Sequence, residues 1–332
     1  MDCPDTAEIK ELMQLVQDGQ AQRLGAGSFG QVYKVGNYVA KRAIINNSQD
    51  IVAYNAEVNT WKALTAYGPL KPYLPVYCGS NHVKAAIGPG QPEAYAFIFQ
   101  KYEPVRDLYD RLQEWKITPL DAGDGIHLFN ALVSGFNIFH NAGYVHRDIK
   151  PANILIRNSD LSPVIVDFGM VCKAGECETG LSGTMSYLPQ NLMYKNDEDR
   201  VNDVCEFPVR PEQVGFLEGL RRTMGCSRGS RRTKATAVRI KLSDKLALPT
   251  YNRASDRYSL SLVLKELVDV IDWAEYGEWK QECVDLIKRY RAGVVPFLAA
   301  SSVKRVDGGR TTRRRRRSSS RSRRHKSRRQ SN

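Results

Sequence analysis

Three polar side chains suited to phosphoryl chemistry lie close together in residues 146–153, which have the sequence HRDIKPAN. Asp148 is followed two residues later by Lys150 and five residues later by Asn153. A carboxylate on a loop can take a proton from a hydroxyl group, and a nearby lysine can neutralise a phosphoryl group in transfer. An asparagine can help to hold a metal ion. The spacing therefore predicts a site where a phosphoryl group is transferred to a hydroxyl group.

A glycine-rich segment precedes this site in the chain, at residues 24–32 (LGAGSFGQV). Glycines let the backbone approach phosphate groups closely, with amide N–H groups as hydrogen-bond donors. A G-x-G-x-x-G pattern alone is weak evidence, because glycine turns are common. Here residues 32–35 alternate like a strand, whereas a dinucleotide-binding fold would open a helix at this point. The segment therefore favours a phosphate-binding loop that leads into a strand.

A second carboxylate ends the apolar strand pattern of residues 162–166. This residue, Asp167, lies 19 positions after Asp148. A buried strand explains the Val and Ile residues but not a carboxylate at its end. Because Mg²⁺ prefers a few carboxylate or amide oxygens together with phosphate, we expect Asp167 to face Asn153.

The apolar periodicity predicts the elements that position these residues. Helices are expected at 6–18, 51–64, 107–115 and 121–141, and strands at 74–83 and 94–102. The first helix is expected to pack on the body through Ile9, Leu12, Met13 and Val16. The longest helix has an apolar side formed by Ile126, Phe129, Leu132, Val133, Phe136 and Phe139. Gly143 is expected to end it in the left-handed conformation.

The order of these features resembles that of a eukaryotic-type serine/threonine protein kinase. The resemblance rests on the glycine pattern at 25–32, on Lys41 after a short apolar strand, on HRD…N at 146–153 and on Asp-Phe-Gly at 167–169. It implies an α+β, bilobal protein kinase-like fold, with a small β-rich N-lobe and a mainly helical C-lobe. Lys150 is similar to the lysine of the Ser/Thr-specific class, whereas tyrosine kinases usually carry Ala or Arg nearby.

The resemblance also implies roles for individual residues, with ATP and Mg²⁺ as cofactors. Asp148 would orient the Ser/Thr hydroxyl and accept its proton, and Lys150 would neutralise the γ-phosphate. Asn153 and Asp167 would bind the metal. The catalytic residues would be Asp148, Lys150, Asn153 and Lys41. The ATP-binding residues would be Leu24, Gly25, Ala26, Gly27, Ser28, Phe29, Gly30, Gln31, Val32, Lys41, Glu57, Lys101, Tyr102, Glu103 and Leu155.

Further positions follow from the same resemblance. Lys41 would pair with Glu57 on the helix after it. Gln100 would be the gatekeeper, and the backbone of Lys101 to Glu103 would bind adenine. The link from Gly30 to Lys41 is short, so the hairpin there should be compact.

The chain departs from the family pattern after its activation segment. Leu188-Pro189-Gln190 replaces Ala-Pro-Glu, and Gln190 cannot form the family's ion pair with an arginine of the C-lobe. Asp256, which would start the central helix and lie beneath the catalytic loop, follows 66 residues later. Residues of about 195–250 are therefore an insertion, and the last helices of the lobe are expected to be shortened. The insertion carries a basic patch of Arg221, Arg222, Arg228, Arg231, Arg232 and Lys234.

The activation segment itself offers three hydroxyl groups, on Thr179, Ser182 and Thr184. Arg147 could receive a phosphate carried by one of them.

These features divide the chain into four predicted parts. They are an N-terminal helical extension (1–19), the N-lobe (20–103), the C-lobe with its insertion (104–301) and a tail (302–332).

The net charge of +13 belongs to the tail. Residues 303–332 contain 14 of the 49 Lys and Arg residues but one of the 36 acidic residues, so the remaining bases and acids balance. This Arg/Ser-rich segment should be disordered. Five consecutive arginines are typical of a nuclear-import or polyanion-binding segment, which predicts nucleic acid or another polyanion as a partner.

The cysteines and the apolar runs indicate the compartment. Seven cysteines without a C-x-x-C pair, beside five histidines, indicate a reduced intracellular protein without structural zinc. No apolar run approaches the length of a membrane span, and the start lacks a secretory signal. We expect an intracellular monomer, in the nucleus because of the Arg-rich tail or in the cytoplasm.

Three hypotheses of function remain. The first is an active Ser/Thr kinase that acts on protein substrates. The second is a pseudokinase or scaffold that binds partners through its insertion and tail, although no catalytic residue is missing. The third is a nucleic-acid-associated protein in which the tail matters most. The compact N-lobe, short C-lobe and basic tail together resemble the divergent kinases of large DNA viruses, which would place the protein in the host nucleus.

Overall fold

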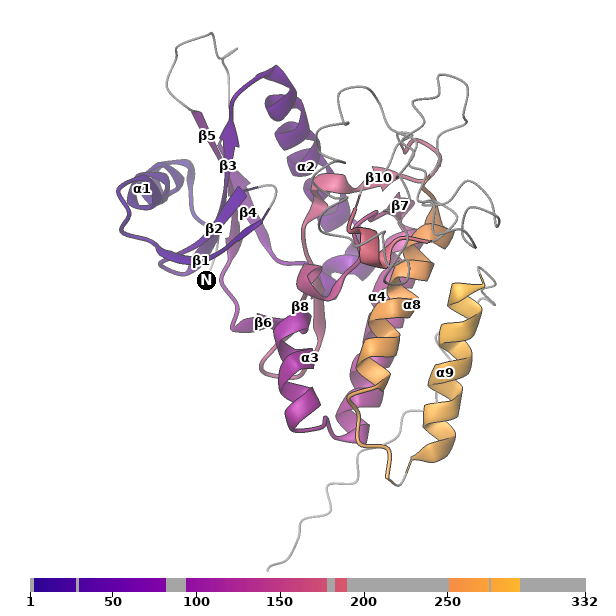
Figure 1. Cartoon of the computed structure of the whole chain (residues 1–332). Coiled ribbons are helices and arrows are strands. Elements are labelled where there is room, and N and C mark those ends of the chain that lie inside the picture. Colours follow the sequence, from indigo (N-terminus) through magenta and orange to yellow (C-terminus); the bar gives the residue numbers. More distant parts are fainter. Residues whose placement is uncertain are drawn as a thin grey trace, which may run out of the picture. The chain divides into compact units, whose positions relative to one another are not determined.

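A five-stranded antiparallel sheet forms the first part of the protein (Figure 1). The computed structural model describes residues 3–27, 30–81, 94–177, 183–189, 251–274 and 276–292. All of them belong to one unit of the chain, Met1–Phe297. The strands are β1 (Gln22–Gly27), β2 (Gly30–Val35), β3 (Tyr38–Ile45), β4 (Tyr77–Ser80) and β5 (Ala94–Lys101), in the spatial order β1-β2-β3-β5-β4. The β2–β3 turn consists of Gly36 and Asn37, so the predicted compact hairpin is confirmed.

Two helices cover opposite faces of this sheet (Figure 1). On one face, Ala40, Phe97 and Phe99 pack against Leu12 and Val16 of α1 (Thr6–Gln17). On the other face, α2 (Ser48–Ala66) packs against the alternate residues of the same strands. The expected packing of the first helix on the body is therefore confirmed.

The predicted strand at 74–83 is shorter than expected in its described part. A 3₁₀ helix, η1 (Gly68–Tyr73), precedes it, and β4 begins at Tyr77. Pro75 lies in the predicted strand but has no N–H group to donate to a ladder, which accounts for the late start.

The second part of the protein is mainly helical (Figure 1). Its elements are β6 (Val105–Asp107), α3 (Leu108–Ile117), α4 (Ala122–Asn141), β7 (Tyr144–Val145), η2 (Pro151–Asn153), β8 (Ile154–Arg157), β9 (Pro163–Ile165), η3 (Phe168–Met170), β10 (Cys172–Lys173), η4 (Met185–Tyr187), α8 (Arg253–Val268) and α9 (Gly277–Arg291). The apolar side predicted for α4 is buried at every position named above. Gly143 follows α4 with φ of 91°, as expected for the residue that ends this helix.

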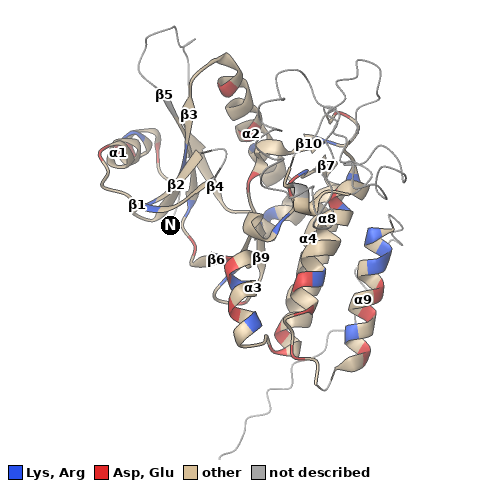
Figure 2. Ribbon diagram, in the orientation of Figure 1, with Lys and Arg blue, Asp and Glu red and all other residues tan. Residues whose placement is uncertain are grey.

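The last helix that the structure describes is α9 (Gly277–Arg291), and the expected shortening of the lobe stays a prediction. In the described ranges α9 is the one helix that follows α8, and it packs along α8. The Tyr290 hydroxyl donates to Asn137 Oδ1 of α4 at 3.0 Å. Acidic Glu278 in the first turn of α9 and three basic residues in its last turn suit the helix dipole (Figure 2). The predicted insertion, Gln190 and the tail lie outside the described residues.

Four of the seven cysteines form disulfides, which corrects the prediction of a reduced chain. Cys3 pairs with Cys78 at a Cα–Cα distance of 5.0 Å, and Cys172 pairs with Cys177 at 5.2 Å. The fold brings the first pair together across 75 residues, and a tight turn brings the second pair together. Sequence spacing alone cannot show either approach. Cys283 is free and buried.

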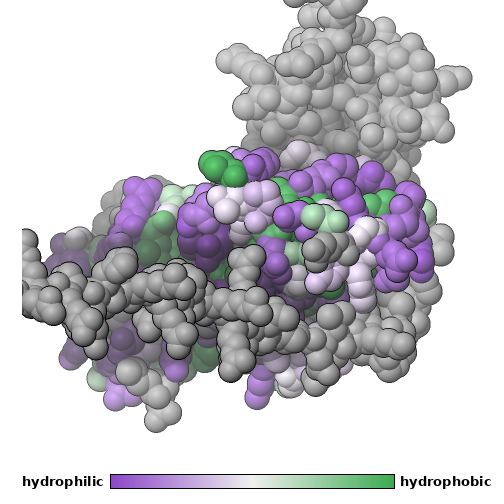
Figure 3. Space-filling model, turned by 90° about the horizontal axis from the view of Figure 1, so that it is seen from below, coloured by the Kyte–Doolittle hydropathy of each residue, from purple (hydrophilic) through white to green (hydrophobic). Residues whose placement is uncertain are grey.

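The described surface carries mixed polar and apolar side chains, as the view from below illustrates (Figure 3). Among the described residues, no helix combines the length and the apolar character that crossing a membrane requires.

Candidate active site

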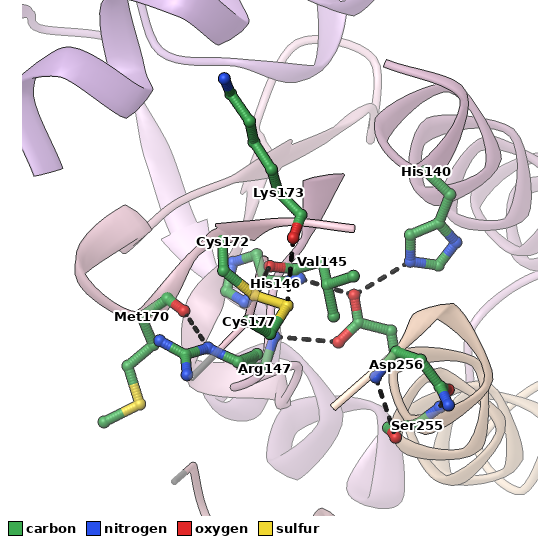
Figure 4. Close-up of a disulfide and its surroundings, with 11 residues drawn as sticks. His140, Val145, His146, Arg147, Met170, Cys172, Lys173, Cys177, Ser255 and Asp256 are labelled. Carbon is green, nitrogen blue, oxygen red and sulfur yellow. Dashed lines mark hydrogen bonds and ion pairs between the residues drawn. A yellow bond between two sulfur atoms is a disulfide. The ribbon is translucent and has the colours of Figure 1, made fainter. Parts of the chain in front are cut away.

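The loop after β7 is held by a buried carboxylate of α8. Asp256 accepts hydrogen bonds from the backbone N–H groups of His146 at 2.6 Å and Arg147 at 2.9 Å (Figure 4). Its Oδ2 also lies 2.9 Å from His140 Nε2. Asp256 is 1% exposed, so these bonds form away from water. The predicted place of Asp256 beneath the loop is confirmed.

The fixed loop presents the carboxylate of Asp148 to three donor residues. Asp148 Oδ2 accepts from Lys150 Nζ at 2.8 Å and from Asn153 Nδ2 at 2.9 Å. Asp148 Oδ1 accepts from the backbone N–H of Thr184 at 2.8 Å and from its hydroxyl at 2.7 Å. The structure therefore brings Asp148, Lys150 and Asn153 together as the sequence predicts.

The surroundings of Asp148 decide its ionisation. Burial alone would raise the pKa of this carboxyl, but hydrogen bonds from Lys150 and Thr184 outweigh it and lower the pKa below its ordinary value. These interactions favour the ionised form at any pH above the ordinary value, and their contribution is lost as the pH falls below it. Asp148 is therefore a carboxylate throughout the neutral range.

Thr184 has a role that the sequence did not reveal. The sequence marked it as a hydroxyl within reach of phosphorylation, whereas here its Oγ1 also accepts from Lys150 Nζ at 2.8 Å. The Thr184 hydroxyl thus bridges Asp148 and Lys150, although Thr184 lies 36 residues after Asp148 in the chain. Thr179 and Ser182 lie outside the described residues.

Replacing Thr184 with Val should raise the pKa of Asp148, because one donor to the ionised form is lost. We expect the acid limb of the kcat profile to move to higher pH and kcat to fall roughly 10-fold. Steady-state rates followed from pH 9 down to pH 3.5, with circular dichroism to show that the chain stays folded, would measure both effects. Thr184→Ser keeps the hydroxyl and should behave as wild type, whereas an unchanged profile in Thr184→Val would contradict this role.

Lys41 of β3 connects the sheet to the loop region. Its Nζ lies 2.6 Å from Glu57 Oε1 of α2 and 3.0 Å from Asp167 Oδ1. Burial alone would lower the pKa of the Lys41 ammonium, but the two carboxylates outweigh it and raise the pKa. The predicted Lys41–Glu57 pair is present, and it extends to Asp167.

Asp167 is held by an unusual backbone and by the aromatic residue after it. Its φ of 67° lies in the left-handed region, which non-glycine residues rarely adopt and which is often found at functional sites. Phe168 is buried between Trp61, with ring centroids 5.2 Å apart, and His146, at 6.4 Å. Trp61 in turn lies 5.7 Å from the Tyr77 ring. These rings form a continuous column from the sheet to the loop.

Trp61 and Tyr77 were not among the predicted site residues. A signal for Trp61 was available, because it lies one helical turn after Glu57 and shares its face of α2. No local signal marks Tyr77, which lies 91 positions before Phe168 in the chain.

The glycine-rich segment forms the β1–β2 hairpin. Gly27 pairs with Gly30, and Val32 lies directly opposite Lys41 on β3. Gly30 has φ of 140°, and a Cβ there would lie 2.3 Å from the Arg42 carbonyl oxygen. Only glycine fits this position. The nearby predicted residues Leu24, Gly25, Ala26 and Gln31 lie on the two strands, and Ser28 and Phe29 lie outside the described residues.

The chain after β5 contains the predicted hinge. Gln100 lies opposite Val39, two residues from Lys41 and therefore on the same face of the sheet. The N–H groups of Lys101 and Tyr102 already donate to Val76 and Asn37, at 3.0 and 2.8 Å. Among the described residues, the Glu103 N–H has no hydrogen-bond acceptor.

The Glu103 side chain is fixed by an arginine of the C-lobe. Arg157, at the end of β8, donates from Nε to Glu103 Oε2 at 2.9 Å and from Nη1 to the Pro72 carbonyl oxygen at 2.8 Å. Leu155 lies on the same short strand, between two buried isoleucines. This link between hinge and C-lobe was not predicted.

The donor set beside Asp148 fits a magnesium ion. Asn153 Nδ2 donates to the backbone carbonyl and the carboxylate of Asp148, both at 2.9 Å, which leaves its amide oxygen for a cation. That oxygen and the Asp167 carboxylate are ligands of the kind that Mg²⁺ prefers. Within the described ranges, no group of three or more His, Cys, Asp or Glu side chains could hold a metal ion.

A fixed carboxylate beside a lysine, with a second lysine under a glycine-rich hairpin, is suited to phosphoryl transfer by positioning and charge. The β-rich first part and the helical second part place these groups as kinases do. The class that the fold and the site define is therefore that of the kinases.

The comparison with known families agrees with this class. A family model described as "Protein kinase domain" matches residues 19–205, which is more than half of the chain. The protein belongs to this family. It is a protein kinase by family, with a β-rich N-terminal part and a helical C-terminal part.

Three relatives illustrate the similarity. The chain is 27% identical over 184 residues to serine/threonine-protein kinase grp of Drosophila melanogaster, covering 53% of this chain and 33% of that protein. It is 28% identical over 163 residues to serine/threonine-protein kinase mos of Xenopus laevis, covering 48% and 43%. It is 36% identical over 98 residues to serine/threonine-protein kinase D of Synechocystis, covering 29% and 19%. The chain thus spans less than half the length of each of these relatives.

Proposed function

We propose that this chain is an ATP- and Mg²⁺-dependent kinase that phosphorylates Ser and Thr hydroxyls of protein substrates. The observation that carries the proposal is the set of hydrogen bonds that the Asp148 carboxylate accepts from Lys150, Asn153 and Thr184. They hold an ionised carboxylate and an ammonium group side by side, which is what transfer to a neutral hydroxyl requires.

In the proposed reaction, Asp148 accepts a hydrogen bond from the substrate hydroxyl and takes its proton. Because the pKa of Asp148 is lowered, orienting the hydroxyl is its larger contribution. Lys150 neutralises the charge of the transferring group, and Thr184 keeps both side chains in place. Bound Mg·ATP supplies the phosphoryl group and the divalent charge.

The nucleotide would be held by the sheet and the hinge. Lys41 would contact the phosphates under the glycine hairpin, and Asn153 and Asp167 would hold the metal. The Glu103 N–H would donate to adenine, because the other two N–H groups of the hinge are already used. Leu155 would contact the base from the C-lobe.

Two observations support Ser and Thr as acceptors. Lys150 is the residue that the Ser/Thr class carries at this position, and its bond to Thr184 fixes it beside Asp148. The three relatives named above are all called serine/threonine-protein kinases.

Transfer to defined acceptors tests the proposal. The full chain would be incubated with Mg·ATP and peptide libraries that contain only Ser, only Thr or only Tyr as acceptor, and phosphate incorporation would be measured by mass spectrometry. We expect labelling of the Ser and Thr libraries that EDTA abolishes and that Asp167→Asn lacks. Asp160→Asn, on the exposed β8–β9 turn, is the matched control and should remain active. Labelling of Tyr alone, or equal labelling by Asp167→Asn, would refute the proposal.

Arg157→Ala should raise the KM for ATP with little effect on kcat. The change removes the bond that fixes the Glu103 side chain and the bond to Pro72 that positions the arginine. The Glu103 N–H must then be ordered by the nucleotide itself, and we expect a rise of roughly 3- to 10-fold. Lys288→Ala, which removes an exposed ion pair of α9, is the control. Binding of adenosine should weaken while binding of magnesium tripolyphosphate should not; equal weakening of both would contradict a role at the hinge.

Several sequence-based statements stay predictions. They are polyanion binding by residues 302–332, the monomeric state, the intracellular or nuclear localisation and the viral source.

A further inference from the structure

We infer that Cys172 and Cys177 form a reversible thiol–disulfide exchange site whose reactant is a small thiol of the glutathione type, and that its disulfide form is the more active form of the kinase. The inference rests on the proposed function, since its effect is on phosphoryl transfer. The chemical step itself can be measured without any kinase assay.

The disulfide closes a short loop at the start of the activation segment. Cys172 follows Asp167-Phe168-Gly169 closely and is joined to Cys177 across five positions. Its strand, β10, pairs with β7, with Cys172 opposite Val145 and Lys173 opposite Tyr144. The strand β7 leads directly to His146. The covalent loop is therefore attached to the strand that carries the catalytic loop (Figure 4).

The segment contacts the catalytic loop on both sides of this disulfide. Before it, the Met170 carbonyl oxygen accepts a hydrogen bond from Arg147 Nε (Figure 4). After it, Thr184 donates twice to Asp148 and accepts from Lys150. A change in the freedom of the loop between these contacts acts directly on the groups that position Asp148.

The disulfide is partly accessible from solvent, on the side of Cys172. Residues 173–176 of the loop are exposed, Cys172 is half-buried and Cys177 is 8% exposed. An incoming thiolate therefore reaches Cys172 Sγ first. Exposed disulfides are more readily reduced than buried structural ones.

The exchange proceeds in two steps. A thiolate attacks Cys172 Sγ, the Cys172–Cys177 bond breaks, and Cys177 leaves as a thiolate that takes a proton. A second small thiolate then attacks the small-molecule sulfur of the mixed disulfide and releases the Cys172 thiolate. Two small thiols are oxidised to one small disulfide, and the protein disulfide is reduced to two thiols. The reverse sequence, with the small disulfide as oxidant, restores the bond.

Reduction should lower activity because it frees the loop. A disulfide acts mainly by reducing the conformational freedom of the chain that it closes into a loop. For a loop as short as residues 172–177 this effect is modest. The remaining contacts include the Ala174 N–H to the Gly143 carbonyl oxygen at 2.8 Å, so the segment keeps part of its order. We expect kcat/KM to fall roughly 3- to 10-fold on reduction rather than to vanish.

The other described cysteines would not cause a fall in kcat/KM on reduction. Cys3 and Cys78 join the start of the chain to β4, on the far side of the sheet from the site. Burial raises the pKa of the Cys283 thiol to about 12, so it forms little thiolate. Cys205 and Cys226 lie outside the described residues and are replaced by Ser in one control.

The experiment uses the full chain equilibrated over a range of reduced and oxidised glutathione. Mass spectrometry of alkylated peptides would give the fraction of protein molecules that contain the Cys172–Cys177 bond. Transfer to the best Ser or Thr peptide would give kcat/KM. The variants are Cys172→Ser/Cys177→Ser, Cys3→Ser/Cys78→Ser and Cys205→Ser/Cys226→Ser. Thermal melting would show that each variant is folded.

We expect activity to follow the fraction of the Cys172–Cys177 bond in wild type and in both control pairs, with full recovery on reoxidation. The Cys172→Ser/Cys177→Ser variant should keep the lower activity under all conditions. Opening of the bond without loss of activity in wild type, or absence of the bond in oxidised glutathione, would overturn the inference. If the oxidised wild type is no more active than Asp148→Asn, the proposed function fails instead, and the exchange at the cysteines is still read by mass spectrometry.

Discussion

Asp148→Asn is expected to lower kcat by about 10³-fold while the KM for ATP changes by less than about a factor of two. The amide has nearly the same shape as the carboxylate, but its NH₂ group cannot accept from Lys150 and Asn153, which now donate to Asp148. The variant therefore loses the proton acceptor and disturbs the position of Lys150. Contacts of Lys41 with Glu57 and Asp167 are unaffected, so nucleotide binding should remain.

Single-turnover transfer and calorimetric binding of Mg·ATP would separate these two effects. Asp160→Asn makes the same chemical change on an exposed turn and should leave both constants unchanged. A loss of less than 10-fold for Asp148→Asn would mean that another group orients the hydroxyl. Equal transfer by wild type and Asp148→Asn would instead favour the alternative of a pseudokinase or scaffold for this chain.

The parts of the site that are close in sequence were predictable. Asp148, Lys150 and Asn153 lie within one loop, so their types and spacing were enough to place them together. The Lys41–Glu57 pair was predicted from the family resemblance, and the strand and helix that carry it are adjacent elements. The fold class followed from the resemblance of these motifs to a protein kinase, and the observed α4 and β2–β3 hairpin agree with it.

The parts that depend on long-range packing were not predictable from local patterns. Thr184 reaches Asp148 across 36 residues, and Arg157 reaches Glu103 across 54. Nothing in the sequence near either residue indicates its partner. The pairing of Cys3 with Cys78 is of the same kind, because it requires the position of the N-terminal segment relative to β4.

The end of the activation segment shows how packing can replace a missing motif. Without the family's glutamate, the described residues still attach this segment to α8. The Tyr187 hydroxyl donates to Glu266 Oε1 at 2.8 Å, and Ser259 Oγ donates to the Tyr187 carbonyl oxygen at 2.7 Å. The segment that carries Thr184 is thus anchored to the same helix that holds the catalytic loop through Asp256.

Asp256→Ala is expected to have the largest effect on stability, about 3–5 kcal/mol of the free energy of unfolding. The change leaves the backbone N–H groups of His146 and Arg147 without their acceptor in a site that is closed to water. It also removes the partner of buried His140 and leaves a cavity. Because the left-handed backbone of Arg147 depends on these bonds, phosphoryl transfer should be lost even where the chain still folds.

Urea denaturation followed by circular dichroism would measure the change, with Asp269→Ala, at the C-cap of the same helix, as the matched control. Asp269 forms an exposed ion pair with Lys265, and its loss should change the free energy of unfolding by about 0–1 kcal/mol. Asp256→Asn keeps one acceptor oxygen and should lie between the two. If Asp256→Ala destabilised the chain no more than Asp269→Ala does, the catalytic loop would have to be held by its own sequence. That result would contradict our inference that α8 fixes the position of Asp148, because the loop would keep its geometry without the helix beneath it.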